Sequence, residues 1–196
     1  MNIRFATIDD LPAILAISNY YAETSPANFA LEPETLEMWM ESFHDTRKMH
    51  PWLVSTQQVS GTGEGTSGEI VTGFAKSSPW KGRCAYNWSA ETTVYVGKDY
   101  QHKGIGRALY ARLIDVLRKQ GYRTILGGIT QPNVASVKLH EAFGYRKVAL
   151  LERVGYKFGR WHDVGYWLLD LVQDDAGSMG RPPEPILPVA MVEPAR

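Results

Sequence analysis

The sequence contains a single cysteine, Cys84, so no disulfide can form within the chain. Its 21 Lys and Arg residues balance its 21 Asp and Glu residues, which argues against a general attraction to nucleic acid or to an anionic membrane. No apolar run approaches the ~20 residues of a membrane span. The first residues, MNIRFATIDD, carry charges where a signal peptide would be apolar. These absences predict a cytoplasmic protein without nucleic-acid or membrane partners.

The chain is long enough for one domain with a sizeable core. It has 196 residues, of which 44% are hydrophobic, and these values are typical of a soluble globular protein. From about residue 173 the sequence is rich in proline, glycine and acidic residues and has no periodicity. We therefore predict a single domain over residues 1–172, followed by a Pro-rich tail over residues 173–196 that is flexible unless something holds it.

The periodicity of the apolar residues predicts alternating strands and helices in the middle of the chain and a closing pair of strands. Such an order indicates a mixed α/β sheet covered by helices. The segment between residues 60 and 68, rich in glycine, predicts an exposed, poorly ordered hairpin loop. Strands are expected at residues 1–7, 52–59, 69–76, 89–97, 123–129, 145–156 and 162–171. Helices are expected at residues 11–18, from 33 to about 43, 105–120 and 133–143.

A glycine-rich turn, QHKGIGRA, lies between the strand ending at residue 97 and the helix starting at residue 105. A helix N-terminus exposes unpaired N–H groups at the positive end of its dipole, so such turns bind anions. The phosphate loop of nucleotide hydrolases is absent, and Leu109 stands where the dinucleotide fingerprint needs a third glycine. The remaining pattern, QxxGxG with Lys103 and Arg107, suits a pyrophosphate. A tight turn with solvent-facing charges is the alternative.

Several segments in the same order resemble a known family. QxxGxG with its helix, followed by a strand and by NxxSxxLHExxGY over residues 133–145, resembles the GCN5-related N-acetyltransferases (GNAT), which bind acetyl coenzyme A (acetyl-CoA) by its pyrophosphate at that turn. NFALEPET, PWKGRCAYNWSAETTVYV and VGYKFGRWHDVGYW are similar to segments of the phosphinothricin and methionine sulfoximine acetyltransferases within that superfamily. The resemblance covers about residues 3–171.

This resemblance implies a GNAT fold, in the α/β (α+β) class. Its central sheet is mixed and mostly antiparallel, with six to seven strands and about four flanking helices. The sheet is splayed between the strands before and after the cofactor-binding helix. The resemblance also implies a homodimer with the active site near the subunit boundary.

The implied reaction transfers an acetyl group from acetyl-CoA to the amino group of a small amino acid, such as L-phosphinothricin or methionine sulfoximine or sulfone. The amine would attack directly in a ternary complex, with no metal and no covalent enzyme intermediate, so Cys84 is not required as a nucleophile. Two alternatives stay open: acetylation of a peptide N-terminus or an antibiotic amine, and a non-catalytic regulator that binds coenzyme A.

Glu91 and His140 are the candidate catalytic residues. An attacking amine must lose a proton, and the alternation of SAETTVYV puts Glu91, Thr93 and Tyr95 on one face of a strand directly upstream of the glycine turn. His140 can exchange a proton near neutral pH and stands where much of the superfamily has a tyrosine that protonates the departing thiolate. Either the two residues share deprotonation of the amine, or Glu91 is the base and His140 the acid.

The resemblance also assigns binding residues. The cofactor-binding residues are Val94, Tyr95, Val96, Gln101, His102, Lys103, Gly104, Ile105, Gly106, Arg107, Asn133 and Ser136. The substrate-binding residues are Phe29, Lys81, Arg83 and Tyr86, whose charges and hydroxyl suit an amino acid with a second oxyanion or polarised group. Ala30 stands where the phosphinothricin branch usually has an arginine, which leaves the choice of substrate open.

Overall fold

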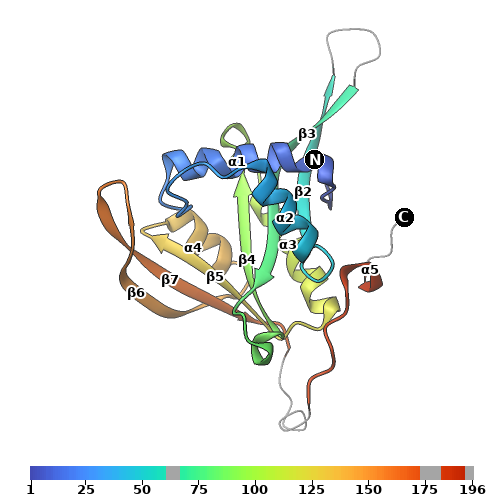
Figure 1. Cartoon of the computed structure of the whole chain (residues 1–196), viewed down its shortest axis with the longest axis vertical. Helices are drawn as coiled ribbons and strands as arrows, with labels where there is room; N and C mark the ends of the chain where they lie inside the picture. Colours follow the sequence, from blue (N-terminus) through green and yellow to red (C-terminus); the bar gives the residue numbers. More distant parts are fainter. Residues whose placement is uncertain (61–66, 173–181, 193–196) are drawn as a thin grey trace.

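The structure of the chain is a computed structural model that describes residues 1–60, 67–172 and 182–192 (Figure 1). It contains one seven-stranded sheet, with the strands in the order β1-β2-β3-β4-β5-β7-β6. The strands are β1 (Asn2–Phe5), β2 (Trp52–Ser60), β3 (Ser67–Pro79), β4 (Ser89–Val96), β5 (Thr124–Gln131), β6 (Arg146–Lys157) and β7 (Arg160–Asp170). The helices are α1 (Leu11–Thr24), α2 (Leu36–Thr46), α3 (Ile105–Gln120), α4 (Val134–Glu141) and the short α5 (Val189–Val192). The core of the predicted hairpin loop, residues 61–66, lies outside the described residues.

The sheet is antiparallel except at its centre. β4 and β5 pair in parallel over three residues each, Ser89–Glu91 with Thr124–Leu126, and their ladder ends there. Beyond these pairs the two strands separate, so the later backbone groups of β4 have no neighbour in β5. The mixed, mostly antiparallel sheet, splayed between the strands before and after α3, is confirmed.

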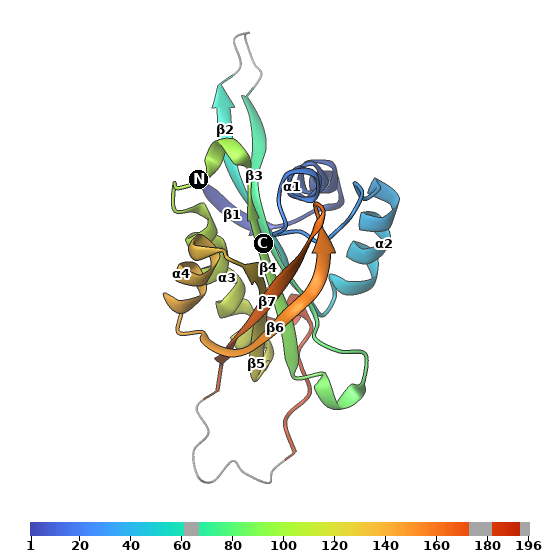
Figure 2. The same ribbon diagram turned by 90° about the vertical axis from the view of Figure 1, so that its left-hand side faces the viewer.

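Helices cover both faces of the sheet: α3 and α4 lie on one face, and α1 and α2 on the other (Figure 2). Leu109, Leu113 and Leu117 of α3 are fully buried in the larger hydrophobic core. A second core on the opposite face holds Trp39 and Trp52, whose rings meet edge to face at 5.6 Å. β4 separates the two cores, because alternate side chains of a strand point to opposite faces.

The alternation predicted for β4 is confirmed. Ala90 packs in the core beside α3, whereas Tyr95 packs against the core beside α1 and α2. Glu91 and Thr93 share the face of Tyr95, and Val94 and Val96 share the face of Ala90. β4 therefore presents one set of side chains to each side of the sheet opening.

Two helix boundaries differ from the prediction. α1 continues to Thr24 instead of ending near residue 18, because Tyr21 packs against Tyr95 and donates a hydrogen bond to the Val96 carbonyl at 2.6 Å. These contacts come from a distant strand and leave no local periodicity. α2 begins at Leu36 and not near residue 33, because the Thr35 hydroxyl caps it by accepting from the Met38 N–H.

The described part of the C-terminal tail, residues 182–192, is held against α3. The Leu187 N–H donates to the Gln120 carbonyl at 2.8 Å, and the Gln120 side chain donates to the Leu187 carbonyl at 2.8 Å. The Trp88 indole donates to the Glu184 carbonyl at 2.7 Å, and Ile186 packs against the larger core. The sequence predicts a tail that is flexible unless something holds it. Residues 182–192 are held, by these contacts with α3, Trp88 and the core.

Candidate active site

Two cavities meet where β4 and β5 separate. One, of about 640 Å³, is lined by α2 and by the Glu91 face of β4, and we call it the α2-side cavity. The other, of about 700 Å³, is lined by α3, α4 and the later residues of β4, and we call it the α3-side cavity. Four residues of the sheet, Thr93, Tyr95, Gly128 and Thr130, belong to both linings, as does Ala27. A molecule in one cavity can therefore contact a molecule in the other through the gap in the sheet.

The glycine turn forms one end of the α3-side cavity. Gly104 adopts the left-handed conformation, with φ of 79°, directly before α3, and the first hydrogen bond within the helix runs from the Ala108 N–H to the Gly104 carbonyl. The N–H groups of residues 105–107 precede that bond and have no acceptor within the helix. Gly106 and Arg107 line the cavity. This end of the cavity can therefore bind an anion at the positive end of the helix dipole.

Most of the predicted cofactor-binding residues line the α3-side cavity. The exceptions are Lys103, whose Nζ donates to the Asp99 carbonyl at 3.0 Å, and Ile105, whose side chain is buried in the core. For these two residues a contact with the cofactor would have to come from the backbone N–H. The lining residues are Val94, Tyr95, Val96, Gln101, His102, Gly104, Gly106, Arg107, Asn133 and Ser136.

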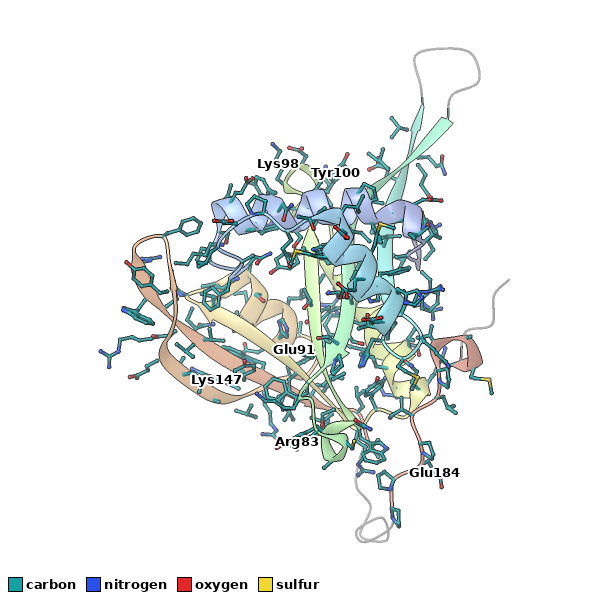
Figure 3. The ribbon with its side chains drawn as sticks, viewed as in Figure 1. Arg83, Glu91, Lys98, Tyr100, Lys147 and Glu184 are labelled. Carbon is teal, nitrogen blue, oxygen red and sulfur yellow. The ribbon has the colours of Figure 1, made fainter. Side chains whose placement is uncertain are left out.

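Glu91 ends the β4–β5 ladder and lines the α2-side cavity. Figure 3 labels it near the middle of the sheet. A Cβ atom built on Gly128 would lie 3.3 Å from Glu91 Oε1, so the glycine leaves space for the carboxylate. Burial raises the pKa of Glu91, and the positive charge of Lys81 opposes this shift. Glu91 is thus a partly desolvated carboxylate with a higher affinity for protons than an exposed one.

His140 is 3% exposed and makes a hydrogen bond through each ring nitrogen. Nδ1 lies 2.8 Å from the Ser136 carbonyl, which can only accept, so Nδ1 carries the proton. Nε2, 2.8 Å from the Tyr110 hydroxyl, then accepts from that tyrosine. Burial lowers the pKa of His140, which keeps the ring neutral at pH 7.

Glu91 and His140 lie on opposite faces of the sheet. Glu91 is next to Gly128, whereas a Cβ on Gly127 would clash with the His140 ring. Consecutive residues of a strand point to opposite faces, so the two candidate catalytic residues reach the opening from opposite sides. Glu91 accordingly lines the α2-side cavity, and His140 lines the α3-side cavity.

The four predicted substrate-binding residues are divided. Phe29 lines the α2-side cavity, next to Gly155 of β6. Lys81, Arg83 and Tyr86 line neither cavity. They lie in the loop between β3 and β4, and Figure 3 shows Arg83 at the far end of that loop from Glu91. Of these three loop residues, Lys81 has a described effect on the site, because its positive charge opposes the rise in the pKa of Glu91.

The sequence profile described as "Acetyltransferase (GNAT) domain" matches residues 3–165. This chain belongs to the GNAT acetyltransferase family. Phosphinothricin N-acetyltransferase from Streptomyces viridochromogenes is 39% identical over 192 residues, covering 98% of this chain and 96% of the relative. The L-methionine sulfoximine/L-methionine sulfone acetyltransferase from Salmonella typhimurium is 34% identical, covering 87% and 94%.

Solved structures have the same GNAT fold. The crystal structure of a GNAT superfamily phosphinothricin acetyltransferase from Sinorhizobium meliloti, in complex with acetyl-CoA, superimposes with a TM-score of 0.77 at 25% identity. The match covers 91% of this chain and 95% of that one. The described residues of this GNAT acetyltransferase hold no cluster of three or more His, Cys, Asp or Glu placed to bind a metal ion. Among the same residues, no helix is long and apolar enough to cross a membrane.

Two lysines of the GNAT domain were not predicted as site residues. Lys76 of β3 lines the α2-side cavity, with Nζ 4.1 Å from the ring centre of Trp52 and 4.8 Å from that of Trp39. The strand periodicity could have indicated it, because Lys76 follows the buried Phe74 at the spacing of residues on one face. A lysine on an inward face of a strand is unusual unless it is paired.

Lys157, the last residue of β6, holds the last turn of α1 and the loop that follows it. It is 3% exposed, and its Nζ donates to the carbonyls of Ala22, Asn28 and Ala30 at 2.5, 2.6 and 2.6 Å. These bonds join the β6–β7 hairpin to the segment that carries Phe29. Two distant parts of the chain, the loop that carries Phe29 and the β6–β7 hairpin, are therefore joined beside the α2-side cavity.

We expect Lys157→Met to lower the free energy of unfolding by about 2 to 4 kcal/mol, because it leaves three carbonyls without their donor. The matched control is Lys103→Met, whose ammonium bonds a single, exposed carbonyl and whose loss should cost less than about 0.5 kcal/mol. Urea denaturation of the ligand-free proteins measures both. Equal stability of the two variants would mean that the hydrogen bonds of Lys157 do not stabilise the fold.

Proposed function

We propose that this GNAT acetyltransferase transfers the acetyl group of acetyl-CoA to the free amino group of a small amino acid, such as L-phosphinothricin or methionine sulfoximine or sulfone. The observation that carries the proposal is the gap between β4 and β5, which joins an anion-binding turn on one side to the Glu91 carboxylate on the other. The names of the relatives at 39% and 34% identity support this substrate class. The amine would attack directly in a ternary complex.

The residues of the α3-side cavity fit acetyl-CoA. The N–H groups of residues 105–107 would hold the pyrophosphate, with Arg107 as a nearby cation. The backbone of Val94–Val96, which has no partner strand on the side of β5, would bond the amides of the pantetheine arm as an added strand would. When bound, acetyl-CoA supplies an activated acetyl group at the gap in the sheet.

Glu91 would accept the proton of the attacking amine. Amines of this kind are mostly protonated at neutral pH and cannot attack in that state. A carboxylate with a raised pKa is better matched to this task than an exposed one, because its proton affinity lies closer to the working pH. The position of Glu91 in the α2-side cavity would place the substrate amine on that side of the gap.

His140 would act from the thioester side. Because it lies across the sheet from Glu91, separate roles for the two residues are better supported than shared deprotonation of one amine. Its Nε2 accepts from Tyr110, so the Tyr110 hydroxyl holds the transferable proton of the pair, and a proton given to the thiolate would have to be returned to Tyr110 from solvent. This favours Glu91 as the base and the His140–Tyr110 pair on the side of the departing thiolate.

Thiol release from acetyl-CoA with a panel of amines tests the function. We expect release with L-phosphinothricin and with methionine sulfoximine, and little with a short peptide. Release with the peptide, or with an antibiotic amine alone, would support the alternative acetyltransferase activities. Tight binding of acetyl-CoA without release with any amine would support a coenzyme A binding regulator.

We also propose a homodimer formed through the β6–β7 hairpin. β6 is an edge strand, and the far half of the hairpin exposes four large apolar side chains by more than half of their surface. Such a patch is typical of a protein interface. These side chains are Val154, Tyr156, Phe158 and Trp161. Sedimentation should give twice the chain mass of 22.0 kDa for the wild type, and a monomer for Trp161→Glu.

A further inference from the structure

Lys76 is a cation without a counterion in the α2-side cavity. Its ammonium contacts the rings of Trp39 and Trp52, and among the described residues it forms no ion pair or hydrogen bond. Burial lowers its pKa to about 8, which reflects a charge that water and carboxylates compensate poorly. Glu34 lines the same cavity, but its carboxylate accepts from the Trp39 indole at 3.1 Å and only partly opposes the shift.

The two indole rings fix the direction of the Lys76 side chain. Lys76 pairs with Trp52 of β2 on one side and with Thr93 of β4 on the other. Its ammonium lies over the Trp52 ring, so it leans towards β2 and away from the strand that carries Glu91. Contacts between a cation and the faces of aromatic rings hold the ammonium in place without neutralising it.

The separation between Lys76 and Glu91 along the sheet determines which part of a substrate each residue can contact. Glu91 lies two residues from Thr93 along β4, which is about 7 Å, and β3 lies about 5 Å to the side of β4. An amino acid whose amine contacts Glu91 has its α-carboxylate only two bonds from that amine, so the α-carboxylate stays close to Glu91. The end of the side chain reaches farther into the cavity and is better placed to span the separation to the Lys76 ammonium.

We infer that Lys76 is the residue that binds a side-chain oxyanion of the substrate, so that the enzyme prefers amino acids with an anionic side chain over neutral isosteres. This inference rests on the proposed function for the location of the amine at Glu91. A side-chain phosphinate or carboxylate would give Lys76 the counterion that the described residues do not supply. A charge-assisted hydrogen bond of this kind, in a partly buried site, gives both affinity and selectivity.

L-phosphinothricin and L-methionine sulfone form a matched pair of probes. Both carry a methyl group and two oxygens on the terminal heteroatom, but the phosphinate is anionic and the sulfone is neutral. We expect the wild type, saturated with coenzyme A, to bind phosphinothricin about 10- to 100-fold more tightly than the sulfone in titration calorimetry. Lys76→Met keeps an unbranched chain between the two indoles. It should remove this difference in affinity, chiefly by weakening the binding of phosphinothricin.

Two further variants make the experiment specific. Lys76→Arg should restore most of the preference, because it restores the charge. Lys147→Met is the control. The Lys147 ammonium also lies over an indole, that of Trp167 at 5.7 Å, but Lys147 is exposed and lines neither cavity. It should bind both probes as the wild type does.

The inference is overturned if Lys76→Met weakens the binding of both probes equally or of neither, or if the wild type binds the two probes with equal affinity. Thiol release by the same proteins reports separately on the proposed function. If phosphinothricin binds through Lys76 but releases no thiol, the binding role stands and the acetylation of this substrate class fails. If both probes are acetylated and Lys76→Met keeps their ratio of kcat/KM, the function stands and the role of Lys76 fails.

Discussion

The Glu91→Gln variant is expected to release thiol about 100-fold or more slowly than the wild type at pH 7, with unchanged affinity for acetyl-CoA. Glutamine keeps the shape of the side chain beside Gly128 but cannot take the proton of the amine. Glu91 lies in the α2-side cavity and outside the lining of the α3-side cavity, so cofactor binding should not change. Steady-state kinetics and calorimetry with acetyl-CoA measure the two quantities.

The pH dependence of both proteins gives a second test of Glu91. Burial raises the pKa of this carboxyl, so the wild type should lose activity as the pH falls through that raised value, where the base becomes protonated. The deficit of the variant should shrink at alkaline pH, where the amine loses its proton without help. Glu184→Gln, at an exposed carboxylate remote from both cavities, is the control (Figure 3). Unchanged turnover of Glu91→Gln would mean that Glu91 does not accept the proton of the amine.

The second large effect is expected at the glycine turn. Gly106→Val should weaken acetyl-CoA binding about 10- to 100-fold, because the added methyl groups occupy the cavity beside the N–H groups of α3. A Cβ at Gly106 would lie 3.6 Å from Val96 and 3.7 Å from Leu139, which is ordinary contact, so the helix itself should tolerate the substitution. Thermal melting of the ligand-free variant checks that the fold is kept.

Gly106 is a cleaner test of this turn than Gly104. Gly104→Val should also weaken binding, but at φ of 79° a valine strains the backbone, so lower affinity could reflect a distorted turn. Gly68→Val serves as the control, because a Cβ there meets no atom within 4 Å. If Gly106→Val binds acetyl-CoA as the wild type does, the pyrophosphate is not held at this turn.

Local sequence predicted the parts of this fold that depend on local physics. The glycine turn, the face of β4 that carries Glu91 and the end of α3 at Gly121 all follow from periodicity or from a backbone conformation that favours glycine. The last turn of α1 was missed because Tyr21 is held by β4, 75 residues away in sequence. Propensity contains no information on such a contact.

The candidate site was only partly predictable for the same reason. That Glu91 and His140 lie on opposite faces depends on which β5 residue stands opposite β4, and this register is set by the whole sheet. The loop residues Lys81, Arg83 and Tyr86 have the chemistry of a binding site but line neither cavity, and the charge of Lys81 still acts on Glu91, so their role in substrate binding stays a prediction. Lys76 could have been predicted as a site residue, because it is a charged residue on the face of a strand that points inward.

The short pairing of β4 with β5 gives this sheet two extra edges at its centre, in addition to the outer ones at β1 and β6. An exposed edge normally invites strands from other molecules, and proteins protect it with charges, prolines or covering segments. Here the inner edges are recessed between α1 and α4, where a slender flexible chain with amide groups can enter and a pleated polypeptide ribbon from another molecule would meet the helices. Backbone groups that lack a partner strand would make an outer edge prone to aggregation, but at this inner location they are accessible only to narrow ligands.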